Sequence, residues 1–100
     1  MAVRQIDLNG DVVNSAGQVI EPIKSVFVAI AERIPSGNLD DAVKARDLAL
    51  RIQKSNGLIK LEGADFDFLQ KRADQAAQAF PALGMAFVAD RMRGAEEIPL

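Results

Sequence analysis

The spacing of hydrophobic residues changes along this chain, from short clusters separated by turn residues to the three- and four-residue repeat of helices. Residues 1–22 hold the short clusters. Asn9-Gly10 predicts a hairpin turn, because both residues tolerate the positive φ that a tight hairpin needs. A second turn is predicted at Ser15 to Gly17, and Pro22 ends the region because it cannot donate to a strand ladder. We therefore predict a β-hairpin region of two or three very short strands.

Two later segments show the single apolar stripe of an amphipathic helix. The first runs from about Ser25 to Ile34 and ends at the breaker Pro35-Ser36-Gly37-Asn38. The second begins at Gly63-Ala64-Asp65, with Asp65 as the predicted cap, and its apolar residues are spaced three, four, three and four apart. These residues are Phe66, Leu69, Ala73, Ala76 and Phe80. We expect both stripes to face the core.

A further helix between these two has a different pattern. It begins near Asp40 or Asp41, whose carboxylates suit a helix N-terminus, and continues to about Lys54. Its apolar residues fall on two sides, of which the narrower holds Leu39, Val43 and Leu50. A helix that is apolar over most of its circumference is usually surrounded by protein. We therefore expect this helix to lie between the others.

The remaining segments are short. Leu58 to Leu61 suits one strand, which could pair with the N-terminal hairpin, and is too short for a helix. Pro81 either kinks the preceding helix or opens a fourth one, which runs to Arg93 and ends at Gly94. We expect residues 95–100 to form a frayed tail.

Length and composition agree with one compact domain. One hundred residues with 49% hydrophobic content can build a single modest core and are too few for two. We predict one domain over residues 1–100 that is mainly α (α+β). Three to four helices occupy residues 23–94, the small hairpin occupies residues 1–22, and one further short strand lies between helices.

Charge and cysteine content favour a cytoplasmic location. The net charge is −2, which gives no general attraction to nucleic acid or anionic lipid, and there is no cysteine for disulfides or thiolate metal sites. The N-terminus shows no signal-peptide core. The longest uncharged run, Ala79 to Ala89, has eleven residues, whereas a membrane-spanning helix needs roughly 20. No membrane association is expected.

The sequence offers no catalytic, cofactor-binding or metal-binding set. There is no histidine, which removes the usual general base and zinc ligand. The acidic cluster Glu62, Asp65 and Asp67 lies at a helix start, where the helix dipole favours negative charge. Nucleic-acid binding is disfavoured because about ten residues separate the helices that a helix-turn-helix would join, and no tyrosine or tryptophan offers a stacking surface. We predict a protein that is not an enzyme.

Arg72 stands out among the charged residues, because it falls inside the apolar arc of its helix near Phe68 and Ala76. Its guanidinium either extends outward along an apolar stem or meets a carboxylate. Outward extension is favoured. The alternative is a buried ion pair or a polar anchor in a subunit interface.

The fourth predicted helix carries apolar residues on two sides. One side holds Met85, Val88 and Met92, and the other holds Leu83 and Phe87. A terminal helix in a small domain needs one face for its own core, so the second face predicts contact with another chain. We predict self-association through Met85, Val88 and Met92, or through Leu83 and Phe87 if the faces are reversed. The alternative is that the other helices cover both faces.

Several short motifs, in this order, resemble a group of small phage and prophage proteins of about 100 residues. The matching residues are Ile6-Asp7-Leu8, Gly17, Leu48-Ala49-Leu50-Arg51-Ile52, Ile59-Lys60-Leu61 before Asp65, and Pro81-Ala82-Leu83 before Gly84. The resemblance covers most of the chain and brings no activity with it. It implies a phage origin, a location in the host cytoplasm or in the virion, and a role as an assembly helper, a virion component or a modulator of host machinery.

Together these observations predict a non-catalytic, phage-encoded protein-interaction module without a cofactor. It is expected to form homo-oligomers and to act in particle assembly or on a host component. The competing hypothesis is a small nucleic-acid-associated phage regulator.

Overall fold

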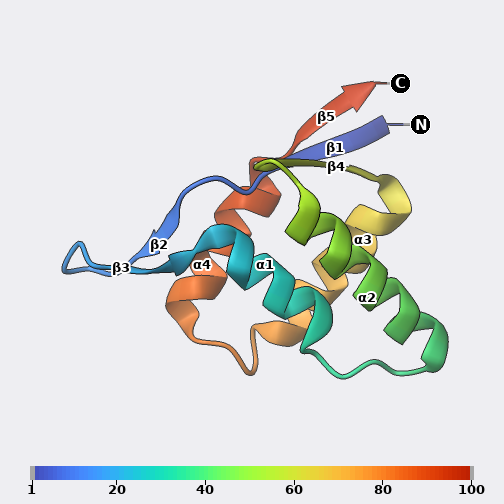
Figure 1. Ribbon diagram of the computed structural model, residues 1–100, viewed down its shortest axis with the longest axis horizontal. Coiled ribbons are helices and arrows are strands. Elements are labelled where there is room, and N and C mark those ends of the chain that lie inside the picture. Colours follow the sequence, from blue (N-terminus) through green and yellow to red (C-terminus); the bar gives the residue numbers. More distant parts are fainter. Residues whose placement is uncertain (1, 100) are drawn as a thin grey trace.

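The computed structural model describes residues 2–99 and shows an α+β fold with four helices and five strands (Figure 1). The strands are β1 (Ala2–Asp7), β2 (Asp11–Val13), β3 (Val19–Pro22), β4 (Leu58–Glu62) and β5 (Glu96–Pro99). The helices are α1 (Ile23–Glu32), α2 (Leu39–Lys54), α3 (Gly63–Ala76) and α4 (Ala82–Arg93). The α+β class agrees with the prediction, and the strands form two separate sheets.

The larger sheet has the order β4-β1-β5, with antiparallel pairing on both sides of β1. The predicted strand at residues 58–61 is confirmed, and it pairs with β1 so that Ile6 lies opposite Ile59. The prediction of a frayed tail at residues 95–100 was wrong for Glu96–Pro99, while Leu100 lies outside the described residues. The second edge of β1 offers backbone partners that hold this segment in place.

The N-terminal hairpin forms at the second predicted turn. Strands β2 and β3 pair antiparallel, and the Asn14 side-chain oxygen accepts hydrogen bonds from the amides of Ala16 and Gln18 at 3.0 and 2.9 Å. The Asn9-Gly10 hairpin was wrong. Gly10 has the positive φ of 96° that the motif suggests, but β1 is already paired on both sides. This segment therefore carries the chain from one sheet to the other, and the hairpin projects from the body of the molecule (Figure 1).

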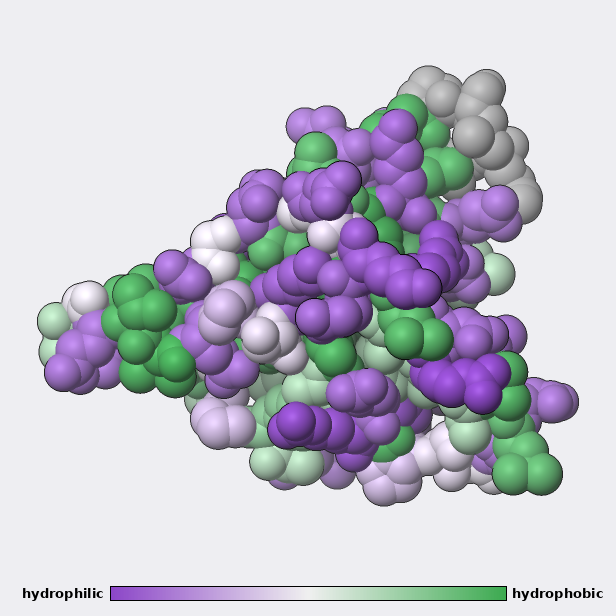
Figure 2. Space-filling model, in the orientation of Figure 1, coloured by the Kyte–Doolittle hydropathy of each residue, from purple (hydrophilic) through white to green (hydrophobic). Residues whose placement is uncertain are grey.

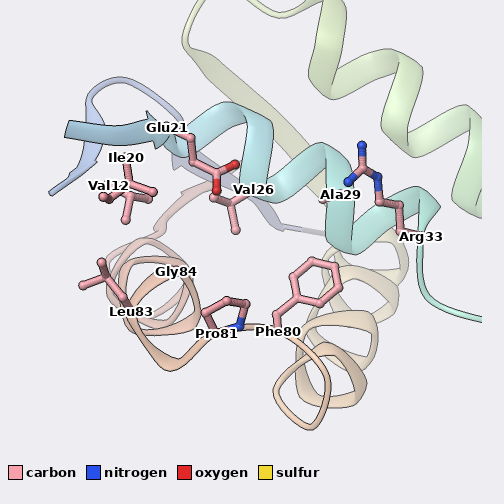
Figure 3. A pocket seen from close by; sticks show the side chains of 10 residues that line it. All are labelled: Val12, Ile20, Glu21, Val26, Ala29, Arg33, Phe80, Pro81, Leu83 and Gly84. Atoms are coloured by element: carbon pink, nitrogen blue, oxygen red, sulfur yellow. The ribbon is translucent and has the colours of Figure 1, made fainter. Parts of the chain in front are cut away.

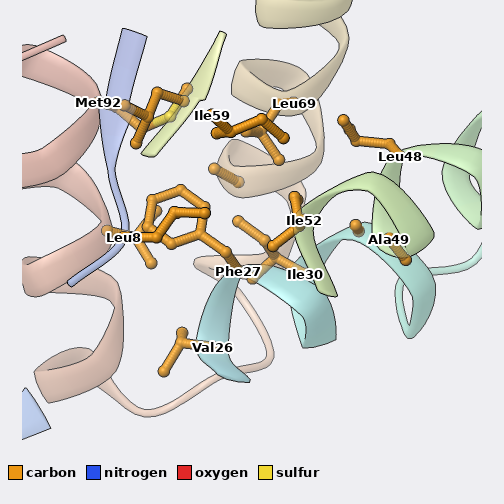
Figure 4. Close-up of a cluster of buried hydrophobic side chains, with 14 of the residues drawn as sticks. Leu8, Val26, Phe27, Ile30, Leu48, Ala49, Ile52, Ile59, Leu69 and Met92 are labelled. Carbon is orange, nitrogen blue, oxygen red and sulfur yellow. The ribbon is translucent and has the colours of Figure 1, made fainter. Parts of the chain in front are cut away.

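The helix α1 is the central element of the core. It contacts α2, α3, α4 and β3, and its Phe27 and Ile30 are fully buried. Figure 4 shows these side chains among Ile52 of α2, Leu8 and Met92. The expectation that α2 would be central was wrong, because its packing partner is α1 and its second apolar side stays outside. Burial of one face is enough to hold a helix of this length.

Helix boundaries follow the prolines and caps of the chain. α1 begins directly after Pro22, and α4 begins directly after Pro81, so Pro81 opens a new helix. α2 is capped by Asn38, whose side-chain oxygen accepts a hydrogen bond from the Asp41 amide at 2.8 Å. The expected cap at Asp65 was wrong, because β4 runs straight into α3 and the helix starts at Gly63. None of the helices in residues 2–99 has the length and apolar character that crossing a membrane requires.

The stripe predicted for α3 is confirmed over most of its length. Phe66, Leu69, Ala73 and Ala76 are buried in the core. Phe80 lies beyond the end of α3, in the turn before α4, where it is partly buried against the core. Because α3 ends at Ala76, Phe80 leaves the stripe and lies on the side of α1, where it lines a groove together with Val26.

Candidate functional site

The interface predicted on the fourth helix is mostly occupied by the core of the protein itself. Val88 and Met92 are 1% and 4% exposed, and Met85 is partly buried beside them. Together with Ala73 and Ala77 these side chains line the seam between α3 and α4. Self-association through Met85, Val88 and Met92 was therefore a wrong prediction. The α3 stripe, whose residues are mainly alanine at this point, leaves room for the α4 side chains to pack.

The reversed face of the fourth helix is partly available. Phe87 is partly buried against the core, whereas Leu83 is 36% exposed near the start of α4. Leu83 contributes to a groove at the junction of the hairpin, α1 and α4. Of the residues predicted for an interface, Leu83 is the one that lies on the surface beside other apolar groups.

Arg72 is buried within the protein and holds the end of α1. Its side chain is 3% exposed, and its guanidinium donates hydrogen bonds to the carbonyls of Ala31 at 2.8 Å, Ile34, and Pro35 at 3.3 Å. Outward extension of the side chain was the wrong expectation, and so was an ion pair as its main contact. The carbonyls at the C-terminus of a helix lack intrahelical partners, and a cationic donor satisfies them well.

The electrostatic surroundings of Arg72 fit this structural role. Burial lowers the pKa of the guanidinium from its usual value, and the negative charge of Asp41 opposes that change. The guanidinium also lies over the Phe68 ring, 5.9 Å from its centre. Because Arg72 is enclosed by its own chain, it is not an anchor that a second subunit can reach.

A groove at the hairpin combines a mainly apolar lining with exposed hydrophobic residues. It has a volume of about 290 Å³ and lies between β2 and β3, one side of α1, and the turn that leads into α4 (Figure 3). Its lining consists of Val12, Ile20, Glu21, Val26, Ala29, Arg33, Phe80, Pro81, Leu83 and Gly84. Figure 3 shows Val26 and Phe80 pointing into the space between α1 and α4. The groove is therefore apolar over most of its surface.

Local sequence explains how the groove is built. The pairing of β2 and β3 shifts by one position after Val12, and such an irregularity bends a strand pair and re-aims its side chains. α1 begins directly after Pro22 and α4 begins directly after Pro81, and both helices contribute side chains to the groove. Gly84 leaves space in the groove, because an added Cβ there would come within 3.7 Å of the Val26 side chain.

Exposed apolar residues extend the groove along the hairpin. Val19 and Ile20 on β3 are 62% and 53% exposed, and Figure 2 shows a hydrophobic cluster among polar groups on the hairpin, at the left. An apolar patch that continues beyond a cavity marks a surface for another macromolecule more often than a site for a small molecule alone. Sequence analysis missed this surface, although the adjacent Val19 and Ile20 just before Pro22 were its signal.

Two charged groups border the groove. Glu21 lies on the α1 side near the hairpin, and Arg33 lies at the end away from the hairpin (Figure 3). Both side chains are exposed, and neither forms an ion pair within the described residues. They can therefore orient a bound segment by opposite charges at two points, while the apolar lining supplies contact area.

Two ion pairs among the described residues join elements of the fold. Arg91 of α4 pairs with Asp7 of β1 at 3.0 Å, and Arg51 of α2 pairs with Asp65 of α3 at 2.9 Å. Among residues 2–99, no cluster of carboxylates is arranged to hold a metal ion. The chemistry that the groove offers is non-covalent binding.

Comparison of the whole chain with protein families, with curated proteins and with solved structures finds no match, so the arrangement of its own residues carries the functional argument.

Proposed function

We propose that this protein is a non-catalytic interaction module that holds a segment of a partner protein in the groove between the hairpin, α1 and α4. The observation that carries the proposal is the continuity of the apolar groove with the exposed Ile20 and Leu83. A groove of about 290 Å³ lies at the small end of ligand cavities. The apolar surface around it extends further, which suits a peptide or a loop better than a small molecule.

The charges at the groove define the chemistry of the partner. Its segment carries apolar side chains that enter between Val26 and Phe80. It has a basic group that faces Glu21 and an acidic group that faces Arg33. Such a pair of charges fixes the direction in which the segment lies, because the reversed orientation would bring like charges together.

The biological setting that we propose is a phage or prophage. It rests on the resemblance of the turn and core motifs to small phage proteins. In that setting the module acts on a virion protein during particle assembly or on a host protein, in the host cytoplasm or in the particle. Self-association belongs to the same proposal.

Selection of peptides from a random library, displayed against the purified protein, tests the proposal. We expect enriched sequences with an apolar centre, a basic residue on one side and an acidic residue on the other. Calorimetry then measures their binding to two matched variants. Ile20→Lys changes the groove lining and should weaken binding by about tenfold or more, whereas Leu58→Lys changes an equally exposed residue on β4, outside the lining, and should leave binding nearly unchanged.

The proposal fails if no peptide is enriched, or if Ile20→Lys binds as well as the parent. Salt-dependent retention of the parent on DNA, abolished by neither substitution, would instead favour the nucleic-acid regulator.

A further inference from the structure

The outer surface of α2 carries a second row of apolar side chains that lies away from the core. Leu39, Val43 and Leu50 are 84%, 48% and 49% exposed. Their spacing of four and seven residues places them along one stripe of the helix. The buried residues of α2, Ala45, Leu48, Ala49 and Ile52, lie on the opposite side. Figure 2 shows hydrophobic groups among charged ones on this part of the surface, at the lower right.

The first and last turns of α2 carry opposite charges, while its middle carries Lys44 and the mutually paired Arg46 and Asp47. Asp40 and Asp41 lie in its first turn, and Arg51 and Lys54 lie in its last turn. Arg51 already pairs with Asp65 at 2.9 Å, but Asp40 and Lys54 have no ion pair within the described residues. The helix is therefore acidic at one end and basic at the other, with an apolar row between them.

We propose that two copies of this chain associate through their α2 helices in an antiparallel arrangement. A two-fold axis across the middle of the stripe brings Leu39 of each copy opposite Leu50 of the other. It also brings the acidic first turn of each helix beside the basic last turn of the other, so that Asp40 lies near Lys54 of the second copy. An isologous contact of this kind requires a surface that is complementary to itself, and this charge distribution meets that requirement.

A parallel arrangement is disfavoured by the same charges. It would place Asp40 beside Asp40 and Lys54 beside Lys54, and it would align the two helix dipoles. Antiparallel pairing instead places opposite charges side by side and opposes the two helix dipoles. The complementarity therefore specifies a second copy of this helix and its direction.

The expected association is weak. A helix of 16 residues is about 24 Å long, so one exposed face of it covers less than the roughly 800 Å² per partner that stable interfaces bury. We expect a dimer that forms at micromolar concentration and dissociates on dilution. The pairing deepens the proposed interaction function by naming one partner, but it uses none of the residues that line the groove.

Sedimentation of the parent and of matched variants tests the apolar row. Leu50→Glu should raise the dimer dissociation constant by about tenfold or more, whereas Val19→Glu, at a site with similar exposure on the hairpin, should leave it unchanged. A parent that remains monomeric at the highest concentration at which it stays dissolved overturns the proposal, and so does equal association of Leu50→Glu and the parent.

Charge exchange tests the direction of the helices. Asp40→Lys alone and Lys54→Asp alone should each weaken association, because each creates two repulsive contacts across the two-fold axis. The double variant should restore it, since both contacts become attractive again. Failure of the double variant to recover association contradicts the antiparallel arrangement.

Cross-linking provides an independent measure of the same geometry. The chain has no cysteine, so introduced thiols react without background. Oxidation of a mixture of Leu39→Cys and Leu50→Cys should give mainly the mixed disulfide, and a product dominated by identical chains would overturn the proposal. Peptide binding to Leu50→Glu reports on the groove separately: retained binding with lost dimerisation supports two distinct surfaces, whereas loss of both contradicts their separation.

Discussion

Replacement of Arg72 by methionine should destabilise the protein more than any other single change of a charged side chain in the described residues. Arg72 is buried and donates to three backbone carbonyls at the end of α1. Methionine has a similar length and fills the space, but it offers no donor. The carbonyls of Ala31 and Ile34 would then be left without this partner in a buried position.

The size of the effect follows from these carbonyls. Each buried acceptor that loses its partner costs about 1–3 kcal/mol, while Pro35 lies nearer the surface, where water can replace the lost bond. Removal of the guanidinium also relieves the cost of burying a charge and its unpaired Nε atom. We expect a net loss of about 2–3 kcal/mol from the 5–15 kcal/mol that is typical of domains. Arg72→Lys should lose less, because an ammonium can still reach one carbonyl.

Urea unfolding followed by circular dichroism at the helical band measures this loss. The chain contains no tryptophan or tyrosine, so intrinsic fluorescence would report poorly on unfolding. Lys71→Met is the matched control, because Lys71 is next to Arg72 in the sequence and its side chain is exposed. This replacement should change the free energy of unfolding by less than about 0.5 kcal/mol. Equal urea midpoints for Arg72→Met and the parent would refute the account of Arg72 as the residue that closes α1.

Four further predictions concern two glycines, one helix cap and one carboxylate. Gly84→Ala should stabilise the protein by up to about 1 kcal/mol, because Gly84 lies inside a helix and an added Cβ meets its neighbour at an ordinary 3.7 Å. Gly57→Ala should destabilise it, because Gly57 has a φ of +98° and an added Cβ would overlap Asn9; thermal melts of both variants check the opposite signs. Asn38→Ala should cost about 1 kcal/mol and Asn38→Ser much less in the same assay, since serine can still cap α2. The backbone amide of Asn9 donates a hydrogen bond to the Asp7 carboxylate, and this bond is the largest cause that lowers the pKa of Asp7 from 3.8. Part of the stability should therefore be lost as the pH falls below this value. Identical acid unfolding curves for the parent and an Asp7→Asn variant would contradict that link.

The helices and one strand could be predicted because their signals are local. The stripe from Phe66 to Ala76 repeats at helical spacing, and its burial in the structure follows directly from that repeat. Leu58 to Leu61 is short and rich in branched residues between two breakers, which left a strand as the favoured conformation. In each case neighbouring residues alone determined the outcome.

Other features depended on partners that are distant in sequence. Asn9-Gly10 favours a hairpin locally, but β1 finds its partners at residues 58–62 and 96–99. Arg72 lies in an apolar arc, and nothing near it in the sequence indicates that the carbonyls of residues 31–35 would meet it. The groove combines the hairpin with residues 80–84, which are about sixty positions away. Local patterns contain no information about such pairings.

The same limit explains the predicted interface on the fourth helix. Its two apolar sides were correctly identified in the sequence, but which side faced the core depended on the small residues of α3. The side with Val88 and Met92 packs there, which leaves Leu83 at the groove. The exposed row on α2 is visible in the sequence as well, but a helix with apolar residues on two sides predicts burial.

Binding at the groove is the central claim, and nuclear magnetic resonance of the isotope-labelled protein tests it most directly. A peptide from the library selection is titrated into the protein while the amide and methyl signals are followed. The account predicts that the largest changes map to Ile20, Ala29 and Leu83, and that they saturate together. Changes that centre on α2 or on the sheet of β4, β1 and β5, with the groove signals unmoved, would contradict it.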